Sequence, residues 1–371
     1  MSSTKRHKVA VVGGAGVWGR RYMRAYADRP DCRIVALVDR AADRRRTSAE
    51  HFGAEAIYDD VEAMLADQVP DIVSIVLPVS ISPKVVMACA RAGVPVVSCE
   101  KPIATSLAEA DEMIRVCRES GTMLGCSTAY WEGRHLVKTA RWLREEKQLG
   151  AVTDASIPSG IGREVSGGGC VSLSLLCLFT GMTVKWVEGR PLASPDGYTW
   201  PPGTPKSEID SGVAGRVGLS GGVVCQLPDP LAYVLKPHCP LSITYENGHV
   251  WVMNYRDPVI ITGTGPIASP YLAPFLQEPT DVLVAPAVAR LVHAFETGEP
   301  VVCDGKNLRH ALEVAIALKQ SAHNGQRRVD LPLTDRSARI LPHAHRLHGG
   351  DAIGWGNTHY QKPPDVEVRS R

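Results

Sequence analysis

Six residues near the start of the chain form a glycine pattern suited to binding a pyrophosphate. The pattern Gly-x-Gly-x-x-Gly directly follows the apolar run Val9–Val12. A strand, this pattern and a helix in succession indicate dinucleotide binding rather than an ordinary turn. Gly14 would permit the tight turn, Gly16 would let the backbone approach the phosphates, and Gly19 would let helix and strand pack closely. The candidate cofactor-binding residues of this segment are Gly14, Ala15, Gly16, Val17, Trp18 and Gly19.

A carboxylate follows at the spacing expected of a ribose ligand. Asp39 comes 20 residues after Gly19, at the end of a second predicted strand. A carboxylate there accepts hydrogen bonds from ribose hydroxyls and repels a 2′-phosphate, which favours NAD over NADP. Arg40 and the run Arg44–Arg46 could instead hold a 2′-phosphate, although charge runs on helices usually face water. We predict NAD as the cofactor, with NADP possible.

Two further short motifs follow later strands, and together with the glycine pattern they carry a family resemblance. Leu77-Pro78 follows the fourth predicted strand, and Cys99-Glu100-Lys101-Pro102 follows the fifth. With the glycine pattern and Asp39 in this order, the chain resembles the Gfo/Idh/MocA oxidoreductases over about residues 7–330. The resemblance implies a Rossmann domain and then an α/β domain with an open, mainly antiparallel sheet. It also implies sugar-like or cyclitol-like substrates and a homo-oligomer, either a dimer or a tetramer.

Lys101 is the catalytic residue that the resemblance implies. It follows a buried strand at the carboxyl edge of the predicted sheet, where ligands of doubly wound folds bind. A lysine there can hydrogen-bond the reacting oxygen, stabilise its developing charge and take part in proton transfer. Glu100 would orient Lys101 or the nicotinamide ribose. The alternative is that Lys101 points to water.

Other positions depart from the family pattern. Ser82 stands where many members have a histidine, and Ser127 and Ala129 stand where many have Asn-x-Arg. Many active members carry Asp and His four apart on a helix after a glycine cluster, but the helix after Gly167–Gly169 contains neither. Candidates to replace that pair follow the sixth predicted strand, where a tyrosine or histidine can relay a proton. They are Tyr130 and His135.

The elements that position these residues alternate between strand and helix. Such a βα rhythm predicts a parallel, doubly wound sheet whose carboxyl edge gathers the motifs. The predicted strands are 9–12, 33–38, 57–58, 71–77, 95–99 and 123–126. The first predicted helix follows the glycine pattern and ends at about residue 27, and the others are 42–52, 60–66, 83–92 and 107–119.

The pattern changes near residue 126. The pair Asn247-Gly248 between two alternating segments predicts a hairpin and an antiparallel sheet. The apolar helix Cys170–Phe179 is available to cover it. We therefore predict three parts: a Rossmann domain over 1–125, a substrate-binding and oligomerisation domain over 126–330, and a tail over 331–371.

The composition excludes several classes of protein. A chain of 371 residues is too long for one core. Its formal net charge of +2 does not suggest nucleic acid or an anionic membrane as partner. No apolar run is long enough to span a membrane. The ten cysteines form no Cys-x-x-Cys pair, so buried free thiols in the cytoplasm are expected.

The tail contains a loose histidine group near Asp351. Its members are His343, His345 and His348. No predicted element fixes their geometry, so we expect no metal site. A mobile tail or a lid over a neighbouring subunit is expected instead.

Three functions remain open on the sequence. The first is an NAD(P)-dependent oxidoreductase that moves a hydride between nicotinamide and a carbinol or ketone carbon of a sugar, glycoside or aminocyclitol-like molecule. The second is an imine or keto reductase of a natural-product pathway, similar to thiazolinyl imine reductases, which lack both the Asp/His pair and a lysine equivalent to Lys101. The third is a non-catalytic dinucleotide-binding subunit, against which Lys101 argues.

Overall fold

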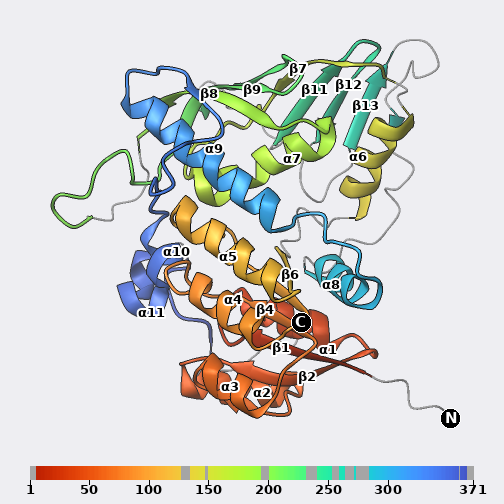
Figure 1. The fold of residues 1–371 in the computed structure, drawn as a ribbon, viewed down its shortest axis with the longest axis vertical. Helices are drawn as coiled ribbons and strands as arrows, with labels where there is room; N and C mark the ends of the chain where they lie inside the picture. Colours follow the sequence, from red (N-terminus) through yellow and green to blue (C-terminus); the bar gives the residue numbers. More distant parts are fainter. Residues whose placement is uncertain are drawn as a thin grey trace. The chain divides into compact units, whose positions relative to one another are not determined.

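The computed structural model forms two compact units (Figure 1). The first combines Met1–Glu132, Val282–Leu308 and Ala344–Arg371, and the second combines Gly133–Asp281 and Arg309–His343. The structure describes residues 6–126, 134–146, 149–193, 200–230, 240–252, 259–263, 271–272, 284–358 and 360–365.

The first unit is built on a parallel six-stranded sheet with the order β3-β2-β1-β4-β5-β6. This order reverses direction between β1 and β4, and such a switch point is where doubly wound sheets bind ligands. Its interior strands are nearly continuous runs of buried apolar residues, as strands covered on both faces require. The strands are β1 (His7–Val12), β2 (Cys32–Val38), β3 (Ile57–Tyr58), β4 (Ile72–Ile75), β5 (Val96–Cys99) and β6 (Met123–Gly125).

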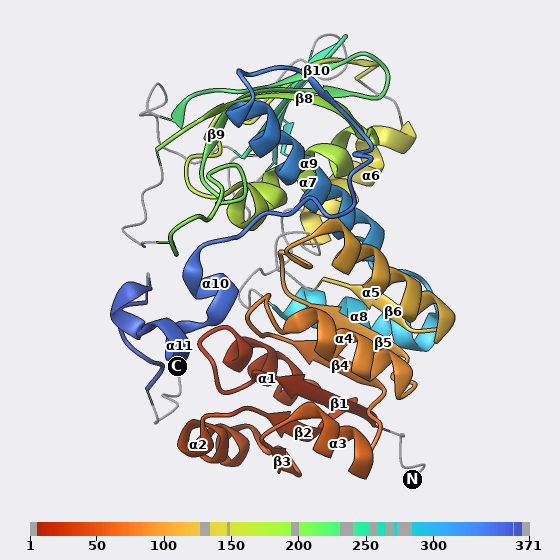
Figure 2. The ribbon, with the colours of Figure 1, turned by 60° about the vertical axis from the view of Figure 1, so that its left-hand side comes forward.

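Helices cover both faces of this sheet (Figure 2). Contacts between neighbouring helices place α1, α2 and α8 on one face and α3, α4 and α5 on the other. Their bounds are α1 (Gly19–Ala27), α2 (Ala42–Phe52), α3 (Val61–Asp67), α4 (Ser82–Arg91), α5 (Leu107–Glu119) and α8 (Ala285–Thr297).

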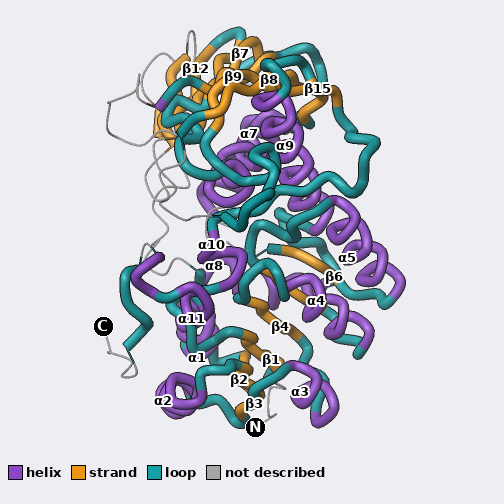
Figure 3. Tube along the Cα trace, turned by 90° about the vertical axis from the view of Figure 1, so that its left-hand side faces the viewer, coloured by secondary structure: helices purple, strands orange, loops and turns teal. Residues whose placement is uncertain are grey.

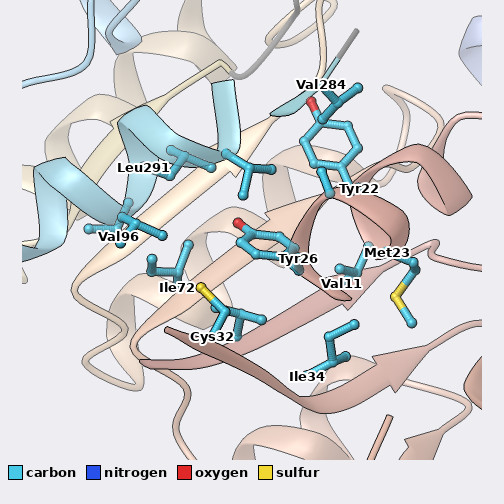
Figure 4. Packing of buried hydrophobic residues seen from close by; sticks show 14 of the residues in the cluster. Val11, Tyr22, Met23, Tyr26, Cys32, Ile34, Ile72, Val96, Val284 and Leu291 are labelled. Atoms are coloured by element: carbon cyan, nitrogen blue, oxygen red, sulfur yellow. The ribbon is translucent and has the colours of Figure 1, made fainter. Parts of the chain in front are cut away.

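Helix α8 comes from far along the chain to complete the core of the first unit. Val288 and Leu291 of α8 are buried in one cluster with Tyr26 of α1 and Ile72 of β4. Figure 4 shows Leu291 facing the strands beside Tyr26 and Ile72. This packing explains why residues 282–308 belong to the first unit, whereas the sequence placed them in a second domain over 126–330.

The second unit contains a mainly antiparallel sheet whose nine described strands have the order β14-β13-β12-β11-β7-β10-β9-β8-β15. Among these described strands, only β7 and β10 pair in parallel. The predicted turn at Asn247-Gly248 joins β11 to β12, which pair antiparallel. The strands are β7 (Val152–Ser156), β8 (Val184–Pro191), β9 (Val213–Leu219), β10 (Val224–Leu227), β11 (Leu241–Tyr245), β12 (Gly248–Val252), β13 (Val259–Gly263), β14 (Tyr271–Leu272) and β15 (Val329–Asp330).

Three helices lie on one face of this second sheet in Figures 1 and 2. They are α6 (Arg134–Glu146), α7 (Cys170–Thr180) and α9 (Gly305–His323). A turn of π-helix, η1 (Val165–Gly169), leads into α7. The fold is therefore the predicted α/β class, a Rossmann sheet followed by a mainly antiparallel one.

The last part of the chain is structured. It forms α10 (Ala344–His348), α11 (Gly350–Ile353) and the short helix η4 (Trp355–Asn357), all in the first unit (Figure 3). The sequence had assigned the whole stretch 331–371 to a separate tail, but only residues from Ala344 onward join the first unit. Among the described residues, no helix is both long and apolar enough to cross a membrane.

Candidate dinucleotide-binding site

The glycine turn joins β1 to α1 at the switch point of the first sheet. Gly13 adopts the left-handed conformation, with φ of 82°, and a Cβ there would lie 2.2 Å from the Val76 carbonyl oxygen. The tight turn is therefore made at Gly13, and Gly14, to which the sequence assigned it, has no positive φ. A Cβ on Gly19 would lie 2.0 Å from the Gly13 carbonyl oxygen, so the close approach predicted for Gly19 is present.

Gly16 and the start of α1 leave room for a ligand. A Cβ on Gly16 would meet one described atom within 4 Å, the Gly13 carbonyl oxygen at 3.3 Å, and otherwise project into a pocket that Gly16 lines. Helix α1 begins at Gly19 without a side-chain cap at Trp18 and without an acidic residue in its first turn. An uncapped N-terminus with its positive dipole end suits a phosphate. These features fit the pyrophosphate of a dinucleotide.

A pocket of about 370 Å³ lies in the first unit at the carboxyl ends of β1, β4 and β5. Segments from four parts of the chain meet there: the glycine turn, the loop after β4, the loop after β5 and the C-terminal residues. It is lined by Gly16, Val17, Trp18, Gly19, Val76, Leu77, Pro78, Val79, Glu100, Lys101, Pro102, His345, Arg346, Gly349, Gly350, Trp355, Thr358 and Tyr360.

Glu100 is tied to the glycine-turn helix. Its Oε1 accepts hydrogen bonds from Trp18 Nε1 at 3.0 Å and from the Tyr22 hydroxyl at 2.7 Å. Burial, reinforced by the Glu100 charge, raises the pKa of Tyr22, so the phenol stays a donor. Glu100 thereby connects the β5 loop to α1. Lys101 follows it as a half-buried residue of the pocket wall.

Asp39 faces the glycine turn from the end of β2. Its two carboxylate oxygens accept hydrogen bonds from the backbone N–H groups of Ala15 at 3.1 Å and Ala41 at 3.0 Å. Burial raises the pKa of this carboxyl, while these hydrogen bonds and the nearby Arg44 charge lower it. Each oxygen keeps a further lone pair with which to accept from a hydroxyl. The side chain is thus fixed beside the turn that would hold the pyrophosphate.

The arginines after Asp39 do not all face water. Arg40 and Arg46 are exposed. Arg45 donates from Nη1 to the Asp39 carbonyl oxygen, and Arg44 pairs with Asp351, its side chain 16% exposed. The interpretation of Arg44–Arg46 as a solvated helix face is therefore wrong for two of the three.

The comparisons with known proteins match the same region. Residues 7–128 match the GFO_IDH_MocA model, described as an oxidoreductase family with an NAD-binding Rossmann fold. This domain belongs to the Gfo/Idh/MocA oxidoreductases. The NAD-binding description of the family agrees with the cofactor predicted from Asp39.

The curated relatives match mostly over this Gfo/Idh/MocA domain. D-apiose dehydrogenase of Paraburkholderia graminis is 35% identical over 123 residues, covering 33% of this chain and 32% of that protein. D-glucoside 3-dehydrogenase of Escherichia coli is 32% identical over 117 residues, covering 32% and 33%. The matches thus span about a third of the length of these relatives. A scyllo-inositol 2-dehydrogenase (NADP(+)) of Bacillus subtilis is 23% identical and extends over 61% of this chain and 67% of its own.

Solved structures support the fold over a longer range. An NAD-binding oxidoreductase of Klebsiella pneumoniae covers 88% of this chain and 99% of its own, with a TM-score of 0.73 and 17% identity. The WlbA dehydrogenase of Bordetella pertussis, in complex with NADH and UDP-GlcNAcA, covers 89% and 100% with a TM-score of 0.67 and 18% identity. At these identities the likeness shows the two-domain fold alone.

The side chains of the two proton-transfer candidates lie outside the part of the chain that the structure describes. Tyr130 lies outside the described residues. His135 lies in the first turn of α6, but its side chain is outside the described part. Helix α7 is largely buried and contains neither Asp nor His.

A buried polar cluster instead surrounds η1, immediately before α7. Asp210 accepts hydrogen bonds from the N–H groups of Val165 and Ser166, at 2.8 and 2.9 Å, and from the Ser166 hydroxyl at 2.6 Å. Lys319 donates to Ser211 at 2.6 Å and is 1% exposed. Sequence reasoning missed this cluster because its members lie far apart in the chain and match no motif.

Proposed function

We propose that the protein is an NAD-dependent oxidoreductase that interconverts a carbinol and a ketone on a sugar-like substrate, with Lys101 at the reacting oxygen. The observation that carries the proposal is the shared pocket: Lys101 lines the same 370 Å³ space as Gly16 and Gly19 of the phosphate-binding turn. The substrate class rests on the relatives, which are named for apiose, glucosides and inositol.

The chain's own residues divide the work. Gly16 and the N-terminus of α1 would receive the pyrophosphate, and Asp39 would accept from the adenosine ribose hydroxyls. NAD, when bound, supplies the hydride acceptor or donor at its nicotinamide. Lys101 would donate a hydrogen bond from Nζ to the substrate oxygen and stabilise the negative charge that develops there. Glu100, held by Trp18 and Tyr22, would keep the β5 loop in place.

The test is oxidation of a panel of pentoses, glycosides and inositols with NAD, followed by NADH absorbance, using wild type and Lys101→Ala. We expect kcat to fall by on the order of 10²–10⁴-fold in Lys101→Ala. The Kd for NADH should change little, because the pyrophosphate and ribose contacts remain. The control is Lys84→Ala, which removes an exposed lysine of α4 in the same unit.

Two results would contradict the proposal. Tight NADH binding without turnover of any substrate would favour a non-catalytic subunit. NADPH consumption with a cyclic imine, unaffected by Lys101→Ala, would favour an imine reductase.

The proposal also includes a cytoplasmic location and a homo-oligomeric state. Native mass spectrometry of the purified protein would report the number of subunits and the bound nucleotide.

A further inference from the structure

The C-terminal segment, here Ala344–Asp365 in its described residues, lies against the dinucleotide site within the same unit. It supplies His345, Arg346, Trp355, Thr358 and Tyr360 to the pocket wall. A Cβ on Gly349 would lie 2.9 Å from the Pro78 side chain, so this segment packs closely against the loop after β4. One wall of the pocket is therefore made by residues more than 240 positions away from the other in the chain.

Hydrogen bonds to its backbone carbonyls hold this segment in place at both ends. The Arg346 carbonyl accepts from the Val79 N–H at 2.8 Å, and the Leu347 carbonyl accepts from the Ser80 N–H at 3.3 Å. Near the far end, Arg20 of α1 donates from Nη2 to the Asp365 carbonyl at 2.5 Å. The segment thus has defined partners on the loop after β4 and on α1.

Between these anchors, Asp351 engages Arg44 of α2. Arg44 Nη2 lies 2.5 Å from Asp351 Oδ2, and the other carboxylate oxygen accepts from Trp355 Nε1 at 2.7 Å. Both carboxylate oxygens of Asp351 accept hydrogen bonds, so these two partners fix the orientation of the carboxylate. The Arg44 side chain is 16% exposed, so much of its surface is withdrawn from water.

The pair lies beside the carboxylate that would bind the ribose. Arg44 is in the first turn of α2, five residues after Asp39. Burial and two backbone hydrogen bonds have the largest effects on the pKa of the Asp39 carboxyl. The Arg44 charge then lowers this pKa, and the Asp351 charge raises it. Both charges therefore act at the place where a dinucleotide would carry either a 2′-hydroxyl or a 2′-phosphate.

We propose that Asp351 is a specificity-determining residue that selects NAD over NADP by holding Arg44. A 2′-phosphate needs a cation, and Arg44 and Arg45 are the two half-buried arginines that follow Asp39, of which Arg45 binds the Asp39 carbonyl. In this chain Arg44 is paired with Asp351 of the C-terminal segment. The inference rests on the proposed use of a nicotinamide dinucleotide.

The test compares the Kd of NADH and NADPH, measured by fluorescence titration, in wild type and Asp351→Asn. The amide is the same size and can still accept from Trp355, but it no longer holds a charge-assisted pair. We expect NADPH to bind roughly tenfold more tightly in Asp351→Asn, since one interaction with a charged group is worth that factor. The Kd of NADH should stay within about twofold of the wild-type value, a much smaller change than the one expected for NADPH.

Two further variants sharpen the result. In Arg44→Ala/Asp351→Asn the gain for NADPH should disappear, because the released guanidinium is what would hold the phosphate. Asp31→Asn is the matched control: it also removes one carboxylate from an arginine pair, with Arg29 at 2.6 Å, in the same unit and away from the pocket lining. It should leave both affinities unchanged.

The outcomes separate the inference from the proposed function. If wild type binds NADH but Asp351→Asn leaves the NADH-to-NADPH ratio unchanged, Asp351 does not set specificity and the proposed function stands. A gain that persists without Arg44 also overturns the inference. If wild type binds neither nucleotide, the proposed function itself fails. Asp351→Ala gives a second variant should the asparagine re-form a bond to Arg44, and Asp351 is 62% exposed, so folding should survive either change.

Discussion

At the scale of single residues, Asp210 shows how far burial alters a carboxyl group in this protein. Burial raises its pKa to about 6, the Glu164 charge adds to this, and hydrogen bonds from Ser166 and Val165 oppose it. The unfolded chain would have a pKa of about 3.9 for this group. The native state therefore binds the proton more tightly than the unfolded state does.

This difference predicts a pH dependence of stability. The stabilisation from protonated Asp210 is fully present below about pH 4 and is lost as the pH rises through 6. We expect the free energy of unfolding of wild type, relative to Asp210→Asn, to fall by roughly 2–3 kcal/mol between pH 4 and pH 7. Urea unfolding of the two proteins at a series of pH values, followed by circular dichroism, measures this.

An exposed aspartate of the same unit serves as the control. Hydrogen bonds from Ser337 lower the pKa of Asp335, so Asp335→Asn should give a trend of opposite sign. A constant difference between wild type and Asp210→Asn across the pH range would mean that Asp210 has the same pKa in the folded and unfolded states.

Some site residues could be predicted from the sequence and others could not. Glu100 and Lys101 could be predicted as site residues because they directly follow a buried strand at the binding edge of the sheet. Asp210 and Asp351 could not, since their partners Ser166 and Arg44 are 44 and 307 positions away. Contacts of that separation depend on tertiary packing, which no local pattern encodes.

At the scale of elements, prediction succeeded where local signals set both ends. The helix Leu107–Glu119 was predicted with its observed bounds, and the Ser106 hydroxyl accepts from the Glu109 N–H at its start. The strands β7 and β8 were missed because their burial does not alternate regularly. The helices α10 and α11 were missed because they are short and polar, and tertiary contacts hold them.

The strand–turn–helix unit of β1 and α1 allows stability and binding to be separated by two glycine substitutions. In Gly19→Ala the new Cβ meets backbone at 2.0 Å, so we expect a loss of about 1–3 kcal/mol in stability. In Gly16→Ala the nearest described atom, the Gly13 carbonyl oxygen, lies 3.3 Å from the new Cβ, so we expect a smaller loss of stability than in Gly19→Ala. The methyl group would nevertheless enter the pocket and weaken NADH binding roughly tenfold, or about 1.4 kcal/mol.

Thermal unfolding without nucleotide and NADH titration of both variants provide the measurement. Gly168→Ala is the control, because a Cβ there meets no described atom within 4 Å and the residue is in the second unit. It should leave NADH binding unchanged. Unimpaired NADH binding by Gly16→Ala would argue that the pyrophosphate does not approach this glycine.

At the scale of the whole molecule, the first unit is assembled from three separate stretches of chain. The sequence predicted contiguous domains because strand and helix patterns are read along the chain. The structure closes the Rossmann core with α8 and the dinucleotide pocket with the C-terminal segment. A ligand in that pocket would therefore act on residues that lie at opposite ends of the sequence.

Hydrogen exchange with and without NADH tests this assembly directly. At NADH concentrations about 100 times the Kd, amides that exchange only after the nucleotide leaves should exchange about a hundredfold more slowly. We expect this protection at the glycine turn and also in α10 and α11, where the Gly349 N–H donates to the His345 carbonyl. Amides of β9 in the second unit should be unaffected. Protection of the glycine turn without any change in α10 and α11 would count against a role for the C-terminal segment in the nucleotide site, because a segment that contacts the nucleotide should open less often while the nucleotide is bound.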